Sequence, residues 1–96
     1  MKTFPRQKNE LSIVAKKFRQ YIARVLQKPE HYCYGISTYT DKRSFGRRLC
    51  LKTYQELTPQ QIYDFVKELE FDGWLPWSGD GPYCGKMVGV KKYVSA

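Results

Sequence analysis

Residues that build metal and redox centres are scarce in this chain, which has one histidine and three cysteines among 96 residues. Cys33, Cys50 and Cys84 are an odd number with no C-x-x-C pair, so the sequence predicts reduced thiols, no metal and no cofactor. His31 has no serine or acid at a recognisable motif spacing, which leaves nucleophilic and general-base roles unsupported. We therefore expect a protein that is not an enzyme.

Long apolar runs are also missing. No stretch has the apolar length needed to cross a bilayer, and the opening MKTFPRQKNE has no apolar segment of the kind found in signal peptides. The sequence therefore predicts a cytoplasmic protein without a membrane partner.

The glycine-rich stretch WSGDGPYCGK, residues 77–86, resembles a phosphate-binding loop but fails its spacing rule. Gly79 and Gly85 are one residue too far apart, and Met87 stands where such a loop needs a hydroxyl to reach the metal. We expect no nucleotide site there.

Positive charge, in contrast, is abundant. Seventeen Lys and Arg against nine Asp and Glu give a net charge of +8, which favours an acidic partner: nucleic acid, an anionic membrane, or an acidic or DNA-handling protein surface. The segment 55–85 is the exception, with six acidic residues and one basic residue. A chain of this length forms one small domain.

The region 10–27 predicts an amphipathic helix after a basic arm at residues 1–8, and Pro29 ends it. The inner stripe consists of Leu11, Val14, Ala15, Phe18, Ile22, Val25 and Leu26. Its opposite side is basic, which suits either a solvated face or a binding face.

Two β-rich runs around DKRS predict a hairpin whose tip is Lys42 and Arg43. That register makes one face apolar and the other basic, and it places Cys33 and Cys50 as diagonal neighbours. On the apolar face we expect Tyr34 and Ile36 opposite Leu51 and Leu49, and on the basic face Ser37, Arg48 and Lys52.

A second helix is predicted from LTPQQIYDFVKELEFDG. Thr58 suits the N-cap, Pro59 the first helical position and Gln61 the capping box, and Asp72-Gly73 marks the end. Leu57 is placed to pack on Ile62, and the inner stripe consists of Ile62, Phe65, Val66 and Leu69. The final segment, 86–96, predicts a short strand that Gly89 weakens.

The sequence thus predicts an α+β fold with an N-terminal helix, a hairpin, a second helix and a Trp/Pro/Gly-rich tail with a further strand. Residues 77–86 are expected to form a loop. Trp77, Pro82 and Tyr83 suit a protein interface, because aromatic anchors held by prolines lose little entropy on burial. The alternative is that Trp74 and Trp77 cap a small core.

Two sets of residues are therefore candidates for binding. For a protein partner they are Lys42, Arg43, Arg47, Arg48, Trp77, Pro82 and Tyr83. For nucleic acid they are Lys16, Lys17, Arg24, Arg47, Arg48 and Lys52, where hairpin cations lie beside Tyr39 and Phe45.

The length, the basic start MKTFPRQKNELSIVAKKFRQYIARVLQ and the tail GWLPWSGDGPYCG resemble the small anti-RecBCD accessory proteins of lambdoid phages. The resemblance implies a non-enzymatic phage protein in the host cytoplasm that binds the RecC subunit of the host recombination nuclease and alters its response to Chi sequences. It also implies that a host prolyl isomerase joins the complex. No residue-level motif is carried over from the family.

Two functions follow as hypotheses. The first is an accessory protein that docks on a DNA repair and recombination nuclease-helicase of the RecBCD type and modulates it. The alternative is a small basic protein that contacts DNA or RNA directly through the first helix and the 39–52 hairpin. Their dependence on salt separates them, because binding to phosphates weakens steeply as salt rises.

Overall fold

Two helices and four strands make up the described part of the chain. The computed structural model describes residues 3–81 and 85–95, with side chains from residue 9 onward in those ranges. The elements are α1 (Thr3–Leu26), β1 (Ser37–Arg43), β2 (Gly46–Thr53), α2 (Pro59–Glu68), β3 (Trp74–Asp80) and β4 (Lys86–Ser95). The predicted α+β fold is confirmed.

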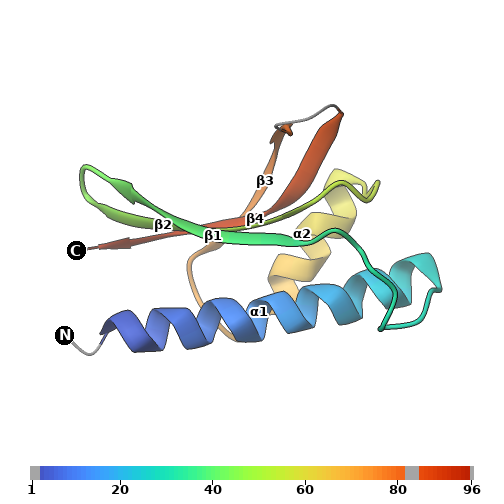
Figure 1. The fold of residues 1–96 in the computed structure, drawn as a ribbon, viewed down its shortest axis with the longest axis horizontal. Coiled ribbons are helices and arrows are strands. Elements are labelled where there is room, and N and C mark those ends of the chain that lie inside the picture. The colour runs from blue at the N-terminus through green and yellow to red at the C-terminus, as the bar shows by residue number, and fades with distance from the viewer. Residues whose placement is uncertain (1–2, 82–84, 96) are drawn as a thin grey trace.

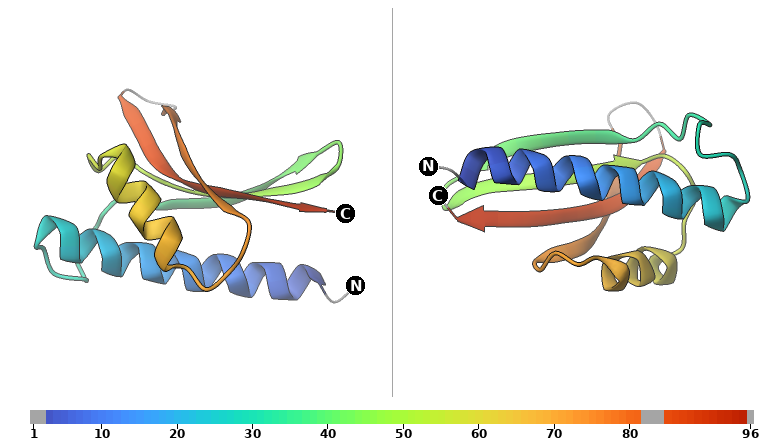
Figure 2. Two further views of the ribbon diagram at one scale, coloured as in Figure 1. Left: turned by 180° about the vertical axis from the view of Figure 1, so that it is seen from behind. Right: turned by 90° about the horizontal axis from the view of Figure 1, so that it is seen from below.

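The strands form one antiparallel sheet in the order β1-β2-β4-β3. Both helices lie on the same side of this sheet (Figure 1). Helix α2 packs against β3 and β4, and α1 lies along the β1–β2 side (Figure 2). Within the described chain, no helix covers the other side of the sheet.

Helix α1 is longer than the sequence predicted, since it begins at Thr3 and includes most of the expected basic arm. Pro5 lies in the first turn, where the missing amide hydrogen breaks no helical hydrogen bond. At the other end Gln27 has a φ of 57°, and the amide of Lys28 donates to the carbonyl of Ala23 at 3.0 Å. This left-handed residue closes the helix two positions before Pro29.

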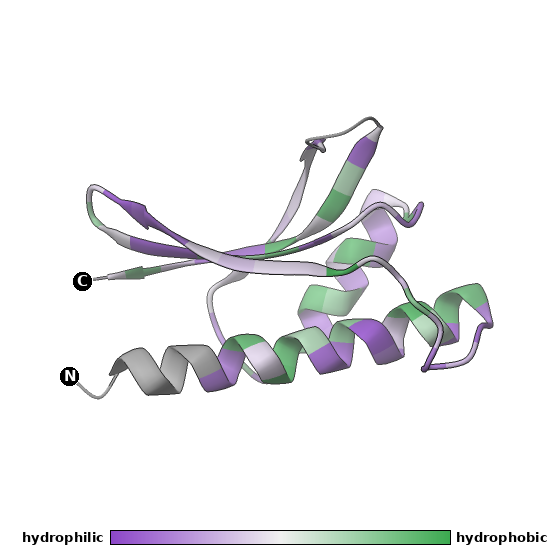
Figure 3. Cartoon of the chain, in the orientation of Figure 1, coloured by the Kyte–Doolittle hydropathy of each residue, from purple (hydrophilic) through white to green (hydrophobic). Residues whose placement is uncertain are grey.

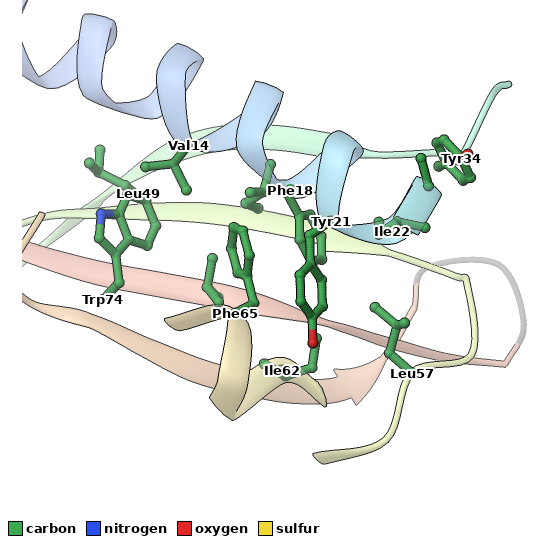
Figure 4. Packing of buried hydrophobic residues seen from close by; sticks show 13 residues of the cluster. Val14, Phe18, Tyr21, Ile22, Tyr34, Leu49, Leu57, Ile62, Phe65 and Trp74 are labelled. Atoms are coloured by element: carbon green, nitrogen blue, oxygen red, sulfur yellow. The ribbon is translucent and has the colours of Figure 1, made fainter. Parts of the chain in front are cut away.

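The core lies between the two helices and the sheet, and aromatic rings from both helices meet in it. The ring of Phe65 lies 4.9 Å from Phe18 and 5.4 Å from Tyr21, measured between centroids. Figure 4 shows these side chains together with residues of the sheet, and apolar positions recur along both helices in Figure 3. Other buried members are Val14, Ile22, Tyr34, Leu49, Leu51, Leu57, Ile62, Trp74 and Val90.

Helix α2 starts as its sequence predicted. The Thr58 hydroxyl accepts from the amide of Gln61 at 3.1 Å, and the Gln61 side chain accepts from the amide of Thr58 at 2.8 Å. The predicted end at Asp72-Gly73 is wrong, because the helix ends at Glu68 and Leu69 is already extended. Leu69 packs on the core, and the extended backbone there leads the chain towards the buried Trp74 of β3.

Replacing Thr58 by alanine is expected to lower the free energy of unfolding by about 1 kcal/mol, because the amide of Gln61 loses its acceptor. Chemical denaturation followed by circular dichroism measures the change. Thr58→Ser keeps the hydroxyl and serves as the control. Equal stability of the alanine variant and the wild type would contradict the contribution of this cap.

The predicted register of the first hairpin is wrong by four residues. Its turn is formed by Ser44 and Phe45, so Thr38 and Thr40 lie opposite Leu51 and Leu49. An even shift leaves each side chain on its expected face. Tyr34 is accordingly buried, although it precedes the strand.

The predicted tail loop is largely wrong as well. Residues 74–80 form the edge strand β3, which tolerates Pro76 because an edge strand leaves some amide positions unpaired. The predicted short strand is the ten-residue β4, which lies between β2 and β3. Pro82 and Tyr83 lie outside the described residues.

Candidate functional site

The candidate site is the face of the sheet that points away from the helices, which we call the open face. Side chains alternate between the two faces of a strand. In β2, Leu49, Leu51 and Thr53 point towards the helices, so Arg48 and Lys52 point away from them. The cross-strand pairs extend this assignment to Tyr39, Asp41, Arg43, Cys50, Leu75, Trp77, Met87, Gly89, Lys91 and Tyr93.

One lysine contacts two aromatic rings on the open face. The ammonium nitrogen of Lys52 lies 3.7 Å from the ring centroid of Trp77 and 5.0 Å from that of Tyr39. Lys52 and Trp77 are both paired with Gly89 of the intervening strand β4, and no side chain of Gly89 separates them. Rings from β1 and β3 thus meet around one cation from β2.

A second group of aromatic and cationic side chains lies nearer the turn of the β1–β2 hairpin. The rings of Phe45 and Tyr93 are 5.5 Å apart, and the Lys91 ammonium lies 5.2 Å from the Tyr93 ring. Lys91, followed by Arg48, lowers the pKa of the Tyr93 hydroxyl from its ordinary value. This part of the open face is therefore positively charged.

Asp41 is the only carboxylate among the open-face residues named above, and two arginines contact it. Arg48 donates to both of its oxygens, at 3.3 and 2.9 Å, and Arg43 lies 3.3 Å away. The hydrogen bond from Arg48 is the main reason that the pKa of Asp41 lies below its ordinary value. Since the arginines outnumber the carboxylate, this cluster keeps a net positive charge.

The open face also exposes apolar surface. Phe45, Leu75 and Tyr93 are 57%, 47% and 40% exposed, and no described element covers them. A solvent-exposed group of large apolar side chains beside cations is typical of a binding surface. This part of the open face is therefore a candidate binding surface.

The candidate cations for a protein partner, which the sequence placed together around the hairpin turn, are divided between the two faces of the sheet. Lys42 is paired with Arg47, and both lie on the helix side of the sheet. Arg43 and Arg48 lie on the open face, where Arg48 is held by Asp41. Trp77 is half-buried on that face, and Pro82 and Tyr83 remain untested outside the described residues.

The candidate residues for nucleic acid are divided between the two layers of the molecule. Lys16, Lys17 and Arg24 belong to α1 in the helical layer, whereas Arg48 and Lys52 point away from it. Arg24 is paired with Glu68 of α2 at 3.0 Å, beside the acidic side of that helix. Arg47 lies on the helix side of the sheet as well, so the structure does not bring all the candidates from α1 and the hairpin onto one surface.

The sequence did not single out three open-face residues: Leu75, Lys91 and Tyr93. Leu75 precedes a proline in the tail, although the apolar and aromatic residues Trp74, Leu75 and Trp77 were a signal of a strand. Lys91 and Tyr93 alternate with Val90 and Val94, which is the pattern of a strand with two different faces.

The cysteines are arranged differently from the prediction. β1 begins at Ser37, so Cys33 precedes it and is exposed, whereas Cys50 is buried between its cross-strand partners Tyr39 and Lys91. Within residues 3–81 and 85–95, no three His, Cys, Asp or Glu side chains gather in a way that could hold a metal ion.

An apolar pocket of about 150 Å³ lies between α2 and the β3–β4 part of the sheet, lined by Leu57, Pro59, Ile62, Pro76, Trp77, Ser78 and Val88. Trp77 thus contributes both to this pocket and to the open face. Among the described helices, none is long and apolar enough to cross a membrane.

The fold and the site define an α+β protein in which two helices cover one side of a four-stranded antiparallel sheet and a cationic, aromatic surface occupies the other. Comparisons with protein-family models, with curated proteins and with solved structures found no match.

Proposed function

We propose that this chain is a non-enzymatic accessory protein that docks on a host DNA repair and recombination nuclease-helicase and modulates it. The observation that carries the docking function is the exposed aromatic pair Phe45 and Tyr93 at the end of the open face. The resemblance of the chain to anti-RecBCD proteins supports a complex of the RecBCD type, through RecC, as the partner. That resemblance also implies a host prolyl isomerase in the assembly.

The chemistry of this surface suits an acidic protein partner. Aromatic and arginine side chains supply most of the binding energy of protein interfaces, especially where they leave water together. Phe45 and Tyr93 form such an anchor, and Arg43, Arg48 and Lys91 lie on the same end of the open face. The charge of +8 favours approach to an acidic surface.

The test is a pull-down from nuclease-treated host lysate with the Phe45→Ala/Arg43→Glu variant, followed by affinity measurement with the purified complex. We expect the variant to lose about 2 kcal/mol or more of binding, because it removes an aromatic anchor and reverses a charge. Arg48 is left intact, because it is only 16% exposed and donates to both oxygens of Asp41, whereas Arg43 is 38% exposed and its replacement leaves the Arg48–Asp41 pair in place.

The control variant is Tyr63→Ala/Lys67→Glu on α2, which changes an exposed aromatic residue and a cation that lie 5.4 Å apart on another surface. It should bind as the wild type does. Equal loss in both variants, or capture of the complex only when DNA is intact, would overturn docking through this surface.

A further inference from the structure

We propose that the half of the open face around Lys52 binds single-stranded DNA, with bases stacked on Trp77 and Tyr39 and phosphates held by Lys52 and Lys91. This activity goes beyond docking on a protein. The choice of DNA over RNA rests on the proposed function, since a nuclease-helicase produces single-stranded DNA. The arrangement of the rings and the cations supports binding of a single strand independently of that function.

The first support is the combination of ring faces and cations on one uncovered sheet surface. Proteins that bind single strands without reading sequence use aromatic side chains as stacking platforms and a positive surface that follows the backbone. Here Tyr39 and Trp77 come from the two edge strands and lie around Lys52. Both rings are half-buried, so each is held in place while part of it is accessible.

Spacing gives the second support. Since the Lys52 ammonium lies 3.7 Å from one ring centroid and 5.0 Å from the other, the two rings are no more than about 9 Å apart. Successive bases in a stacked strand are about 3.4 Å apart, so bases up to two or three steps apart in one strand can reach both rings. A duplex cannot use this surface in the same way, because its base faces are already covered by stacking.

The lysine itself is suited to exchange partners. Each contact of a lysine ammonium with a ring face is weak on its own, and Lys52 is only half-buried. A phosphate can therefore attract the ammonium while the released ring face accepts a base. Lys91 lies further along β4 beside Tyr93, so the basic and aromatic positions continue towards Phe45.

Charge complementarity favours a polyanion over a neutral partner. The open-face residues named above include one carboxylate, Asp41, and four cations: Arg43, Arg48, Lys52 and Lys91. Two acidic residues of the 55–85 segment, Asp64 and Glu68, instead lie on α2 in the helical layer. A strand of phosphates is thus attracted to the sheet side of the molecule and repelled near α2.

The experiment is a fluorescence anisotropy titration of the purified full chain, without any protein partner, against a labelled oligothymidylate. An oligouridylate and a DNA duplex of equal length are measured in parallel at about 50 mM salt, where phosphate contacts are strong. We expect the oligothymidylate to bind at least about fivefold more tightly than the duplex, in line with the energy of stacking one base.

The decisive pair of variants is Lys52→Glu and Lys67→Glu, which change the net charge equally. Lys67 lies beside an aromatic ring, Tyr63, as Lys52 does, but it is on α2. Lys52→Glu should weaken binding to the oligothymidylate at least about tenfold, and Lys67→Glu by less than about twofold. Trp77→Ala should weaken it at least about fivefold, and Trp77→Phe should keep most of the affinity.

Thermal unfolding of each variant is followed by circular dichroism, so that only folded variants are compared. An equal effect of the two lysine variants, or duplex binding as tight as that of the single strand, would overturn the site. Tighter binding of the oligouridylate would overturn the assignment to DNA. These results are independent of the protein docking test, because that test changes Phe45 and Arg43 and uses nuclease-treated lysate.

Discussion

Replacing Gly89 by alanine is expected to destabilise the fold by about 3 kcal/mol or more. An idealised Cβ at Gly89 would lie 2.8 Å from the Cα of Lys52 and collide with the carbonyl oxygen of Leu51. Both obstacles are backbone atoms of β2, so no change of rotamer relieves them, and the central pair of strands must move apart. Urea denaturation at neutral pH measures the loss.

Gly35→Ala is the matched control. Gly35 has a φ of +62°, but an added Cβ there meets nothing within 4 Å. Its cost is therefore backbone strain alone, about 1–2 kcal/mol. If Gly89→Ala cost no more than Gly35→Ala, the close approach of β4 to β2 would not be the reason for glycine at position 89.

The second large effect is expected from Glu10, which connects α1 to strands β3 and β4 on the helix side of the sheet. One of its oxygens accepts from the indole nitrogen of Trp74 at 2.9 Å and from the ammonium of Lys92. The side chains of Lys92 and Glu10 are only 20% and 12% exposed. Glu10→Ala leaves a largely buried cation and an indole donor without this acceptor, and should cost about 3 kcal/mol.

Glu68→Ala provides the comparison, because it breaks another ion pair between elements far apart in the sequence. The Arg24–Glu68 pair is 63% and 53% exposed, so its removal should cost less than about 1 kcal/mol. The double variant Glu10→Leu/Lys92→Met, which removes both charges, should recover much of the stability lost in Glu10→Ala. Equal losses for Glu10→Ala and Glu68→Ala would show that burial does not strengthen the first pair.

Local signals accounted for the parts of the fold that were predicted. The start of α2 needs only Thr58, Pro59 and Gln61, whose interactions are complete within four residues. The faces of Arg48 and Lys52 followed from alternation with Leu49 and Leu51, and a shift of four residues could not change them.

The missed parts depend on contacts between distant segments. Residues 77–86 were predicted to be a loop, and Pro76 is acceptable in a strand here because β3 lies at the edge of the sheet. Lys52 and Trp77 were both candidates, but their contact was not predicted, because they become neighbours only through the β2-β4-β3 order. No short-range pattern in the sequence encodes that order.

The central place of β4 has a consequence for the newly made chain. β4 is the last of the four strands to be synthesised, yet it supplies the pairing edge for both β2 and β3. Until residues 86–95 emerge from the ribosome, the β1–β2 hairpin and β3 have no common partner, and their inner edges stay open to incorrect pairing. Assembly of the sheet is therefore a late event, in which β4 joins the β1–β2 hairpin to β3. It depends on contacts between residues far apart in the sequence.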